Sequence, residues 1–155
     1  MLGPEETIII IDDSPGVWPS QSRARVLVPR RYHFFDSSAA RDASTSACVG
    51  HFGRGGDEPE AGGQLDALLN VLRRVHAHFF ESLGSAPPEA AASLDVAESV
   101  AAVRRRVLAG VRVLFSGVIP LGEVEPERHS AWRLALQLGA SVATDKDPQA
   151  RAPPL

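Results

Sequence analysis

The stretch that decides the fold is Thr7-Ile8-Ile9-Ile10-Ile11-Asp12-Asp13-Ser14-Pro15-Gly16. Its first half is a β-branched run without polar alternation, which is typical of a strand buried on both faces in a parallel sheet. Its second half consists of two acids followed by turn-forming residues, so the strand ends abruptly at Asp12. The two carboxylates therefore lie at the C-terminal end of a strand, where open α/β sheets place their functional sites.

The acidic pair Asp12 and Asp13 has two chemical interpretations. Carboxylate oxygens at a strand end suit Mg²⁺, a hard cation that prefers oxygen ligands and usually keeps several of its waters. Because neighbouring strand residues point to opposite faces, one aspartate would face the metal while the other braces a partner. The metal-free alternative is a helix cap or an Asx turn at Asp13-Ser14-Pro15. The residues alone leave both interpretations open.

Downstream of this strand, the pattern predicts helices joined by loops. Apolar residues recur every three or four positions from Gln64 to Leu83, which indicates an amphipathic helix. A second helix is expected from Glu89 to Ala109, because arginines in its last turn and Gly110 just beyond it are typical of a helix C-terminus. We also expect a short strand at Val26 to Val28 and a flexible loop at 36 to 63, which is rich in Ser, Ala, Gly and Asp.

The last third of the chain predicts a second small α/β segment. Val111 to Ser116 and Ser141 to Thr144 have the apolar character of strands, and Ser130 to Leu138 forms a short helical pattern between them. A strand, a helix and a strand within about 35 residues make a parallel βαβ unit of minimal size. Residues 145 to 155 contain three prolines and no periodicity, so a disordered tail is expected there.

Composition and charge exclude several classes of function. The chain has 155 residues, 44% hydrophobic and 23% charged, which fits one ordinary domain or two small ones. A net charge of -3 argues against sequence-independent binding to nucleic acid. The run Ile8 to Ile11 is far shorter than the roughly 20 apolar residues that a membrane span needs. The single Cys48 cannot form an intrachain disulfide, and the acidic N-terminus is unlike a secretory signal.

Two families place an acidic pair after such a strand. A response-regulator receiver also needs a later acceptor aspartate after a buried strand, but Asp57 lies in a glycine-rich stretch. The run Ile8 to Pro19 instead resembles the last acidic motif of the haloacid dehalogenase superfamily, as it occurs in phosphatases of the RNA polymerase II C-terminal domain. Arg31-Tyr32-His33-Phe34-Phe35 resembles the aromatic segment of those enzymes, and the helix with Val71 to Phe80 is similar to theirs. The likeness is to the plant-type members.

The order of domains in that family implies a BRCT domain after the catalytic domain. Arg105 to Gly117 resembles the first BRCT strand, and Trp132 to Thr144 resembles the first helix and second strand. The resemblance thus implies an α/β fold with a partial haloacid-dehalogenase-like parallel sheet, a helical linker and a partial BRCT βαβ unit. The expected division is 1–84 for the C-terminal part of the catalytic domain, 85–110 for the linker, 111–144 for the partial BRCT domain and 145–155 for the tail.

The resemblance also implies an activity and a set of site residues. It implies a nuclear, Mg²⁺-dependent protein-serine/threonine phosphatase that acts on the phosphorylated tail of RNA polymerase II and so regulates transcription. Transcription factors are further expected partners, whereas direct contact with nucleic acid or membrane is not expected. Asp13 matches the family's direct metal ligand, and Asp12 matches the acid that pairs with an active-site lysine.

The catalytic nucleophile of that family lies in an Asp-x-Asp-x-Thr motif, which the sequence lacks. Asp145-Lys146-Asp147 follows no buried strand, so no catalytic residue is assigned and the chain alone is expected to be inactive. The alternative is a non-catalytic BRCT-like module that binds phosphopeptides. Ser116 and Gly117 match the phosphate-binding pair of such modules, although they fit the plain end of a strand equally well.

Overall fold

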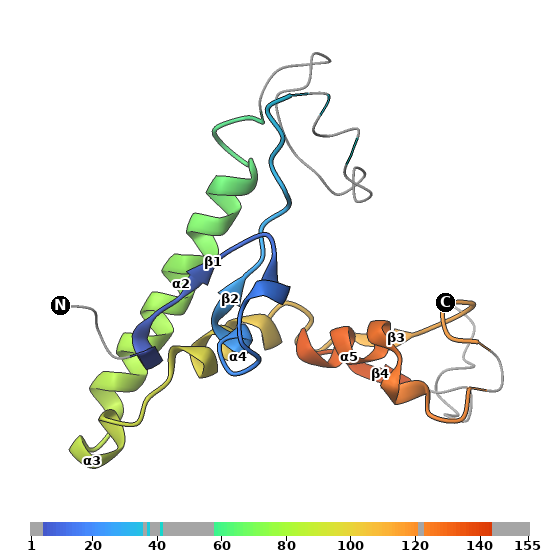
Figure 1. The fold of residues 1–155 in the computed structure, drawn as a ribbon. Coiled ribbons are helices and arrows are strands. Elements are labelled where there is room, and N and C mark those ends of the chain that lie inside the picture. The colour runs from blue at the N-terminus through green and yellow to red at the C-terminus, as the bar shows by residue number, and fades with distance from the viewer. Residues whose placement is uncertain (1–4, 36, 38–40, 42–57, 121–122, 144–155) are drawn as a thin grey trace. The chain divides into compact units, whose positions relative to one another are not determined.

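A computed structural model describes residues 5–35, 37, 41, 58–120 and 123–143 of the chain (Figure 1). The chain divides into two compact units, residues 1–100 and 101–155, and the boundary falls inside one helix. Most of the loop expected at 36–63 and all of the tail expected at 145–155 lie outside the described residues. No helix in the described part is long and apolar enough to cross a membrane.

The first unit contains a two-stranded parallel sheet. β1 (Ile10–Ile11) pairs with β2 (Val26–Leu27), and Ile10 lies opposite Val26. Val26 and Leu27 are buried, but Ile8 and Ile11 are 38% and 48% exposed. The prediction of a strand buried on both faces is therefore wrong for this first strand, because β2 is the only strand that pairs with it within the described ranges.

Three short 3-10 helices flank these strands. They are η1 (Glu5–Thr7), η2 (Pro15–Val17) and η3 (Arg23–Arg25). Both η2 and η3 lie in the connection between β1 and β2, so the two strands of this unit are joined without an α-helix. Pro15 at the first position of η2 is favourable because its fixed φ suits a helical start and it has no N–H to leave unpaired.

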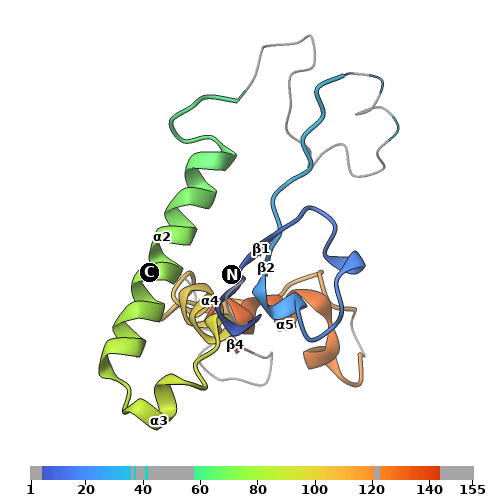
Figure 2. The ribbon, with the colours of Figure 1, turned by 60° about the vertical axis from the view of Figure 1, so that its left-hand side comes forward.

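The predicted amphipathic helix is confirmed as α2 (Gln64–Ser85). Figure 2 shows it as one continuous helix that leads into α3 at its C-terminal end. Glu58 accepts the backbone N–H of Gln64 at 2.7 Å, which satisfies one of the unpaired donors at the helix start. The helix runs on to Ser85, past the expected end at Leu83, and Val75 is its fully buried residue.

The prediction of a single helix from Glu89 to Ala109 is wrong, because the chain forms two separate helices there. α3 (Pro88–Ala91) is one turn long, and α4 (Val96–Arg105) begins after a break. Asp95 causes the second start, since its Oδ1 accepts the backbone N–H of Ala97 at 2.8 Å in the manner of a helix N-cap. α4 ends at Arg105 and not at Ala109 as expected, so Gly110, which has a left-handed φ of 78°, does not directly follow the helix.

The second unit is the predicted βαβ arrangement. β3 (Arg112–Leu114) runs parallel to β4 (Ser141–Ala143), with η5 (Pro126–Arg128) and α5 (Ser130–Gln137) in the connection between them. The Nδ1 atom of His129 caps α5 by accepting the N–H of Ala131 at 3.2 Å. The rings of Phe115 and Trp132 stack with their centroids 6.4 Å apart.

A close backbone approach joins the two ends of this second unit. Gly139 has a φ of 93°, and a side chain there would collide with the backbone carbonyl of Arg105. Next to it, the N–H of Leu108 donates to the carbonyl of Leu138 at 2.8 Å. Glycine is required at position 139 both for the left-handed conformation and for the space.

The buried residues of the two units are small and mostly aliphatic. Since both sheets are parallel and helices follow or connect their strands, the expected α/β class is confirmed. Among the described residues, the buried side chains of the first unit are Val26, Leu27, Val75, Val96, Ser99 and Val100, and those of the second unit are Val103, Ala135, Ala140 and Ala143.

Candidate functional site

The carboxylate of Asp12 is turned into its own loop at the end of β1. Its Oδ1 accepts the backbone N–H of Ser14 at 2.7 Å, and its Oδ2 accepts the indole N–H of Trp18 at 2.9 Å. The backbone N–H of Asp12 donates to the carbonyl of Leu27 at 3.2 Å, which continues the pairing of the two strands. Both carboxylate oxygens are thus engaged by protein donors.

The neighbouring Asp13 is exposed. Its Oδ1 accepts the hydroxyl of Ser14 at 2.7 Å, and within the described part of the chain no donor reaches its Oδ2. The Asx turn therefore forms on Asp12, because the Ser14 amide bonds to that side chain, and not on Asp13 as the metal-free alternative had it. The two aspartates have separate environments, one engaged and one open.

Arg23 stabilises the same loop through two hydrogen bonds to backbone carbonyls. The guanidinium of Arg23 donates to the carbonyl of Trp18 at 3.0 Å and to that of Gly16 at 3.4 Å. The sequence analysis did not identify Trp18 or Arg23 as functional residues. Both residues lie in the connection between β1 and β2, which contains only short 3-10 helices, so no helical or strand periodicity signals these contacts.

The Arg25–Asp95 pair fixes the start of α4 to the strands of the first unit. The guanidinium of Arg25 donates from Nε to Oδ1 at 3.0 Å and from a terminal nitrogen to Oδ2 at 2.8 Å, a two-pronged contact between residues 70 positions apart. The hydrogen bond from Arg25 is the main reason that the pKa of Asp95 lies below its usual value. The same contact raises the pKa of Arg25.

The donor set at the loop fits a role as one ligand of Mg²⁺. Asp13 offers an exposed carboxylate oxygen, and Mg²⁺ is usually held through one or two carboxylates together with waters and substrate phosphates. The described residues contain no group of three His, Cys, Asp or Glu side chains placed to hold a metal ion. Asp13 therefore fits as a single ligand, and the described part of the chain does not form a complete metal cage.

The other predicted site residues lie in the second unit or outside the described ranges. Ser116 and Gly117 follow β3 in an exposed bend, and Gly117 has a φ of 72°. Residues 145 to 147, which hold the only Asp-x-Asp sequence, are not among the described residues. The predicted binding pair is thus accessible to solvent, and its role in phosphopeptide binding stays a prediction.

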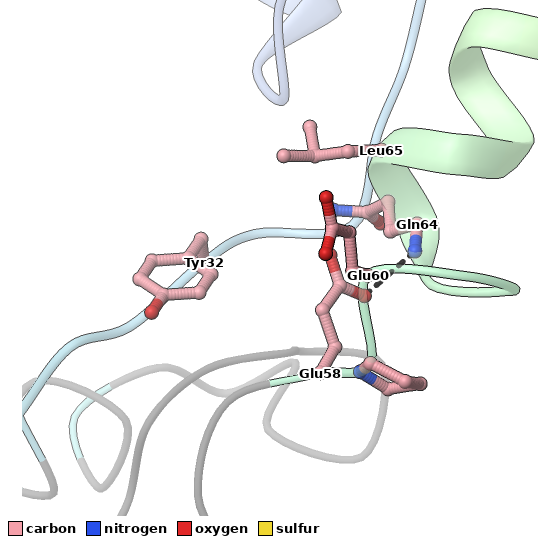
Figure 3. Close-up of a pocket in the computed structure, with 6 residues that line it drawn as sticks. Tyr32, Glu58, Glu60, Gln64 and Leu65 are labelled. Atoms are coloured by element: carbon pink, nitrogen blue, oxygen red, sulfur yellow. Dashed lines mark hydrogen bonds between the residues drawn. The ribbon is translucent and has the colours of Figure 1, made fainter.

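A pocket lies at the start of α2 (Figure 3). The sequence analysis did not identify it, although Tyr32 belongs to the aromatic segment that carries part of the resemblance. The Glu58 carboxylate in its wall is held by the Gln64 amide. The pocket does not include the Asp12–Asp13 loop. Its lining residues are Tyr32, Glu58, Pro59, Glu60, Gln64 and Leu65.

Comparison with known proteins relates this chain to one group of enzymes. No protein-family model matches. The RNA polymerase II C-terminal domain phosphatase-like 4 of Arabidopsis thaliana is 35% identical over 147 residues, which cover 95% of this chain and 32% of that protein. The chain is similar in sequence to RNA polymerase II C-terminal domain phosphatases. The expected family resemblance is confirmed.

Further relatives carry a similar description. The phosphatase-like 3 protein of Arabidopsis thaliana is 33% identical over 95% of this chain and 11% of its own length. An RNA polymerase II C-terminal domain phosphatase of Caenorhabditis elegans is 30% identical over 91% of this chain and 21% of its own length. This chain therefore spans about a third or less of the length of each of these relatives.

Solved structures of Fcp1, an essential RNA polymerase II CTD phosphatase, share the fold. One superposes with a TM-score of 0.54 at 21% identity and covers 90% of this chain and 46% of its own. A fission yeast Fcp1 variant bound to beryllium fluoride gives a TM-score of 0.53 at 20% identity, over 92% of this chain and 48% of its own. At 21% and 20% identity, these two superpositions show that this chain shares their fold, and they show nothing beyond the fold.

Proposed function

We propose that this chain is part of a nuclear protein-serine/threonine phosphatase that removes phosphate from the C-terminal tail of RNA polymerase II. The observation that carries the proposal is 35% identity to a plant phosphatase-like protein over 95% of the chain. The acidic loop after a parallel strand supports it, because carboxylates at that place can hold the divalent cation that phosphoryl transfer uses. Dephosphorylation of the polymerase tail would regulate transcription.

In this proposal the two aspartates have different tasks. Asp13 holds Mg²⁺ through its exposed carboxylate, and the ion when bound neutralises charge on the phosphoryl oxygens. Asp12 fixes the loop through the Ser14 amide and the Trp18 indole, so that Asp13 is presented at the end of the strand. The proposal assigns no nucleophile to these residues, and a metal ligand without a nucleophile gives negligible hydrolysis.

The proposed division follows the domain order of the family. Residues 1–84 are the C-terminal part of the catalytic domain, 85–110 a helical linker, 111–144 a partial BRCT domain and 145–155 a tail. The Ser116–Gly117 bend is the proposed contact for phosphopeptides, supported by its exposure directly after β3. Transcription factors are proposed as further partners.

The test begins with the gene. The transcript is sequenced through the codons for Met1 and Leu155, and the product of the complete reading frame is assayed for phosphate release from a doubly phosphorylated polymerase-tail peptide with Mg²⁺. We expect Asp13→Asn to lower kcat/KM at least about a hundredfold, since it removes a metal ligand. Glu98→Gln, which neutralises an exposed carboxylate on α4, is the matched control. Equal activity of the Asp13 variant and the control would contradict the proposed metal role.

The same peptide separates the non-catalytic alternative. If the purified 155-residue chain binds the peptide with a micromolar Kd and Ser116→Ala abolishes the binding, a phosphopeptide-binding module is the better account. If the reading frame encodes neither turnover nor binding, both functions fail.

A further inference from the structure

Trp18 contacts the proposed site without being one of its carboxylates. Its indole N–H donates to Oδ2 of Asp12 at 2.9 Å, while the Ser14 amide occupies Oδ1 at 2.7 Å. Hydrogen bonds to an ionised carboxylate are about twice as strong as those between neutral groups. Together they account for both oxygens of Asp12, whereas Asp13 accepts only the Ser14 hydroxyl within the described part of the chain.

The position of Trp18 is itself fixed. The Arg23 guanidinium donates to the Trp18 carbonyl and to the Gly16 carbonyl, so the backbone on which the indole is mounted is held at two points. The Trp18 side chain is half-buried. A single arrangement of the loop therefore satisfies the indole, the guanidinium and the Asp12 carboxylate at once.

We propose that Trp18 is a positioning residue for a divalent cation at Asp13, because its indole N–H keeps the Asp12 carboxylate inside the loop and leaves Asp13 alone to meet the cation. The inference rests on the proposed metal role of Asp13. Groups that orient a metal ligand through hydrogen bonds commonly change metal affinity by about 10- to 100-fold when they are removed. Without the indole, the Asp12 carboxylate keeps only the Ser14 amide as a donor, so it can turn outward and compete with Asp13 for the cation.

The test uses Mg²⁺ alone as the probe and NMR of the ¹⁵N-labelled product of the complete reading frame, because this chain supplies a single carboxylate ligand. The indole N–H signal of Trp18 is assigned by its disappearance in Trp18→Phe. We expect this signal to shift saturably as Mg²⁺ is added, and we expect Asp13→Asn to abolish the shift. Asp12→Asn is expected to move the same signal in the absence of Mg²⁺, since it weakens the hydrogen bond.

The decisive variant is Trp18→Phe, which keeps an aromatic ring and removes the N–H. The amide signals of Asp13 and Ser14 then report Mg²⁺ binding, and we expect the Kd to rise about tenfold. Trp132→Phe removes the other indole and is the matched control, for which we expect an unchanged Kd. Unchanged amide signals of Val26 in the Trp18 variant would show that the strand pairing is kept.

Arg23→Gln gives a second readout if the Trp18 variant does not fold. Removing a positive charge from the same loop would strengthen Mg²⁺ binding by simple electrostatics. Loss of the support for Trp18 would weaken it. We expect weaker binding, and tighter or equal binding would overturn the positioning role.

The outcomes separate this inference from the proposed function. If Asp13→Asn abolishes Mg²⁺ binding but Trp18→Phe binds like the Trp132 control, the positioning role is overturned and the metal role of Asp13 stands. If the Mg²⁺-dependent shift survives Asp13→Asn or is absent from the unsubstituted chain, the proposed metal site fails and this inference falls with it.

Discussion

The two parallel strand pairs of this chain are connected in different ways. Between β3 and β4 the connection contains α5, so its backbone groups are largely satisfied within a helix. Between β1 and β2 it contains only the short η2 and η3, and side chains supply the remaining bonds. Parallel strands need a crossover of about a dozen residues or more, usually a helix. The contrast teaches that the acidic loop depends on its side chains to a degree that the second crossover does not.

The largest effect is expected where the second unit has no room for a side chain. Gly139→Ala places a Cβ against the carbonyl of Arg105 at a φ of 93°, and we expect it to lower the free energy of unfolding by about 3 kcal/mol. Urea unfolding followed by Trp132 fluorescence in a Trp18→Phe background measures it. Gly84→Ala is the control, since it lies in α2 with open space around it, and it should stabilise by about 0.5 to 1 kcal/mol. Equal stability of the two variants would contradict the close approach.

A smaller loss is expected from Asp95→Ala in the first unit. The change removes the N-cap of α4, which is worth about 1 kcal/mol, and it also breaks the two-pronged contact with Arg25. Urea unfolding followed by circular dichroism measures the loss. Asp66→Ala, on the first turn of α2, is a carboxylate control without an arginine partner in the described structure. If both variants lose the same amount, the Arg25 contact contributes nothing.

The pH dependence of stability should follow the same ion pair. The pKa of Asp95 is lowered in the folded chain from its usual 3.8, chiefly by the hydrogen bond from Arg25. Because the pKa of Asp95 is lower in the folded chain, the ionised carboxylate stabilises the folded state. This contribution is complete above pH 3.8 and is lost as the pH falls through the lower pKa of the folded chain. We expect thermal unfolding of Asp95→Asn to depend less on pH in this window than that of the unsubstituted chain. Parallel pH profiles would show that the pair does not form in solution.

The smallest effect concerns local opening of the acidic loop. Asp12→Ala removes the acceptor of the Ser14 amide, and we expect hydrogen exchange at that amide to accelerate about tenfold, the equivalent of one net hydrogen bond. Amides inside α5 should exchange at unchanged rates, because their acceptors are backbone carbonyls of the same helix. Unchanged exchange at Ser14 would mean that the loop holds its shape without the Asp12 side chain.

The features that could be predicted from the sequence are those encoded in neighbouring residues. The period of apolar residues located α2, and Gly139 lies just past the C-cap of α5, whereas Gly110 lies five residues beyond the end of α4. The break before α4 was missed although its N-cap is local, since Asp95 accepts the N–H of Ala97 two residues on. The contact of Asp95 with Arg25, 70 residues away, is one that no local pattern reports.

The candidate site divides in the same way. The Asp12–Asp13 pair after an apolar strand was recognisable, since strand ends are where α/β sheets place functional side chains. The distinct roles of the two carboxylates depend on Trp18 and Ser14 as donors, which alternation along a strand does not specify. The metal role of Asp13 still rests on the family resemblance.

The ion pair between Arg25 and Asp95 has a consequence for the order of events during synthesis. At about 5 to 20 residues per second, a ribosome needs roughly 4 to 14 s to add the 70 residues that separate the two partners. During that interval β1 and β2 are already available to pair, but the start of α4 has not been made. The nascent strand pair must therefore persist for seconds without the carboxylate that later anchors its guanidinium, a period in which a chaperone has access to its exposed isoleucines.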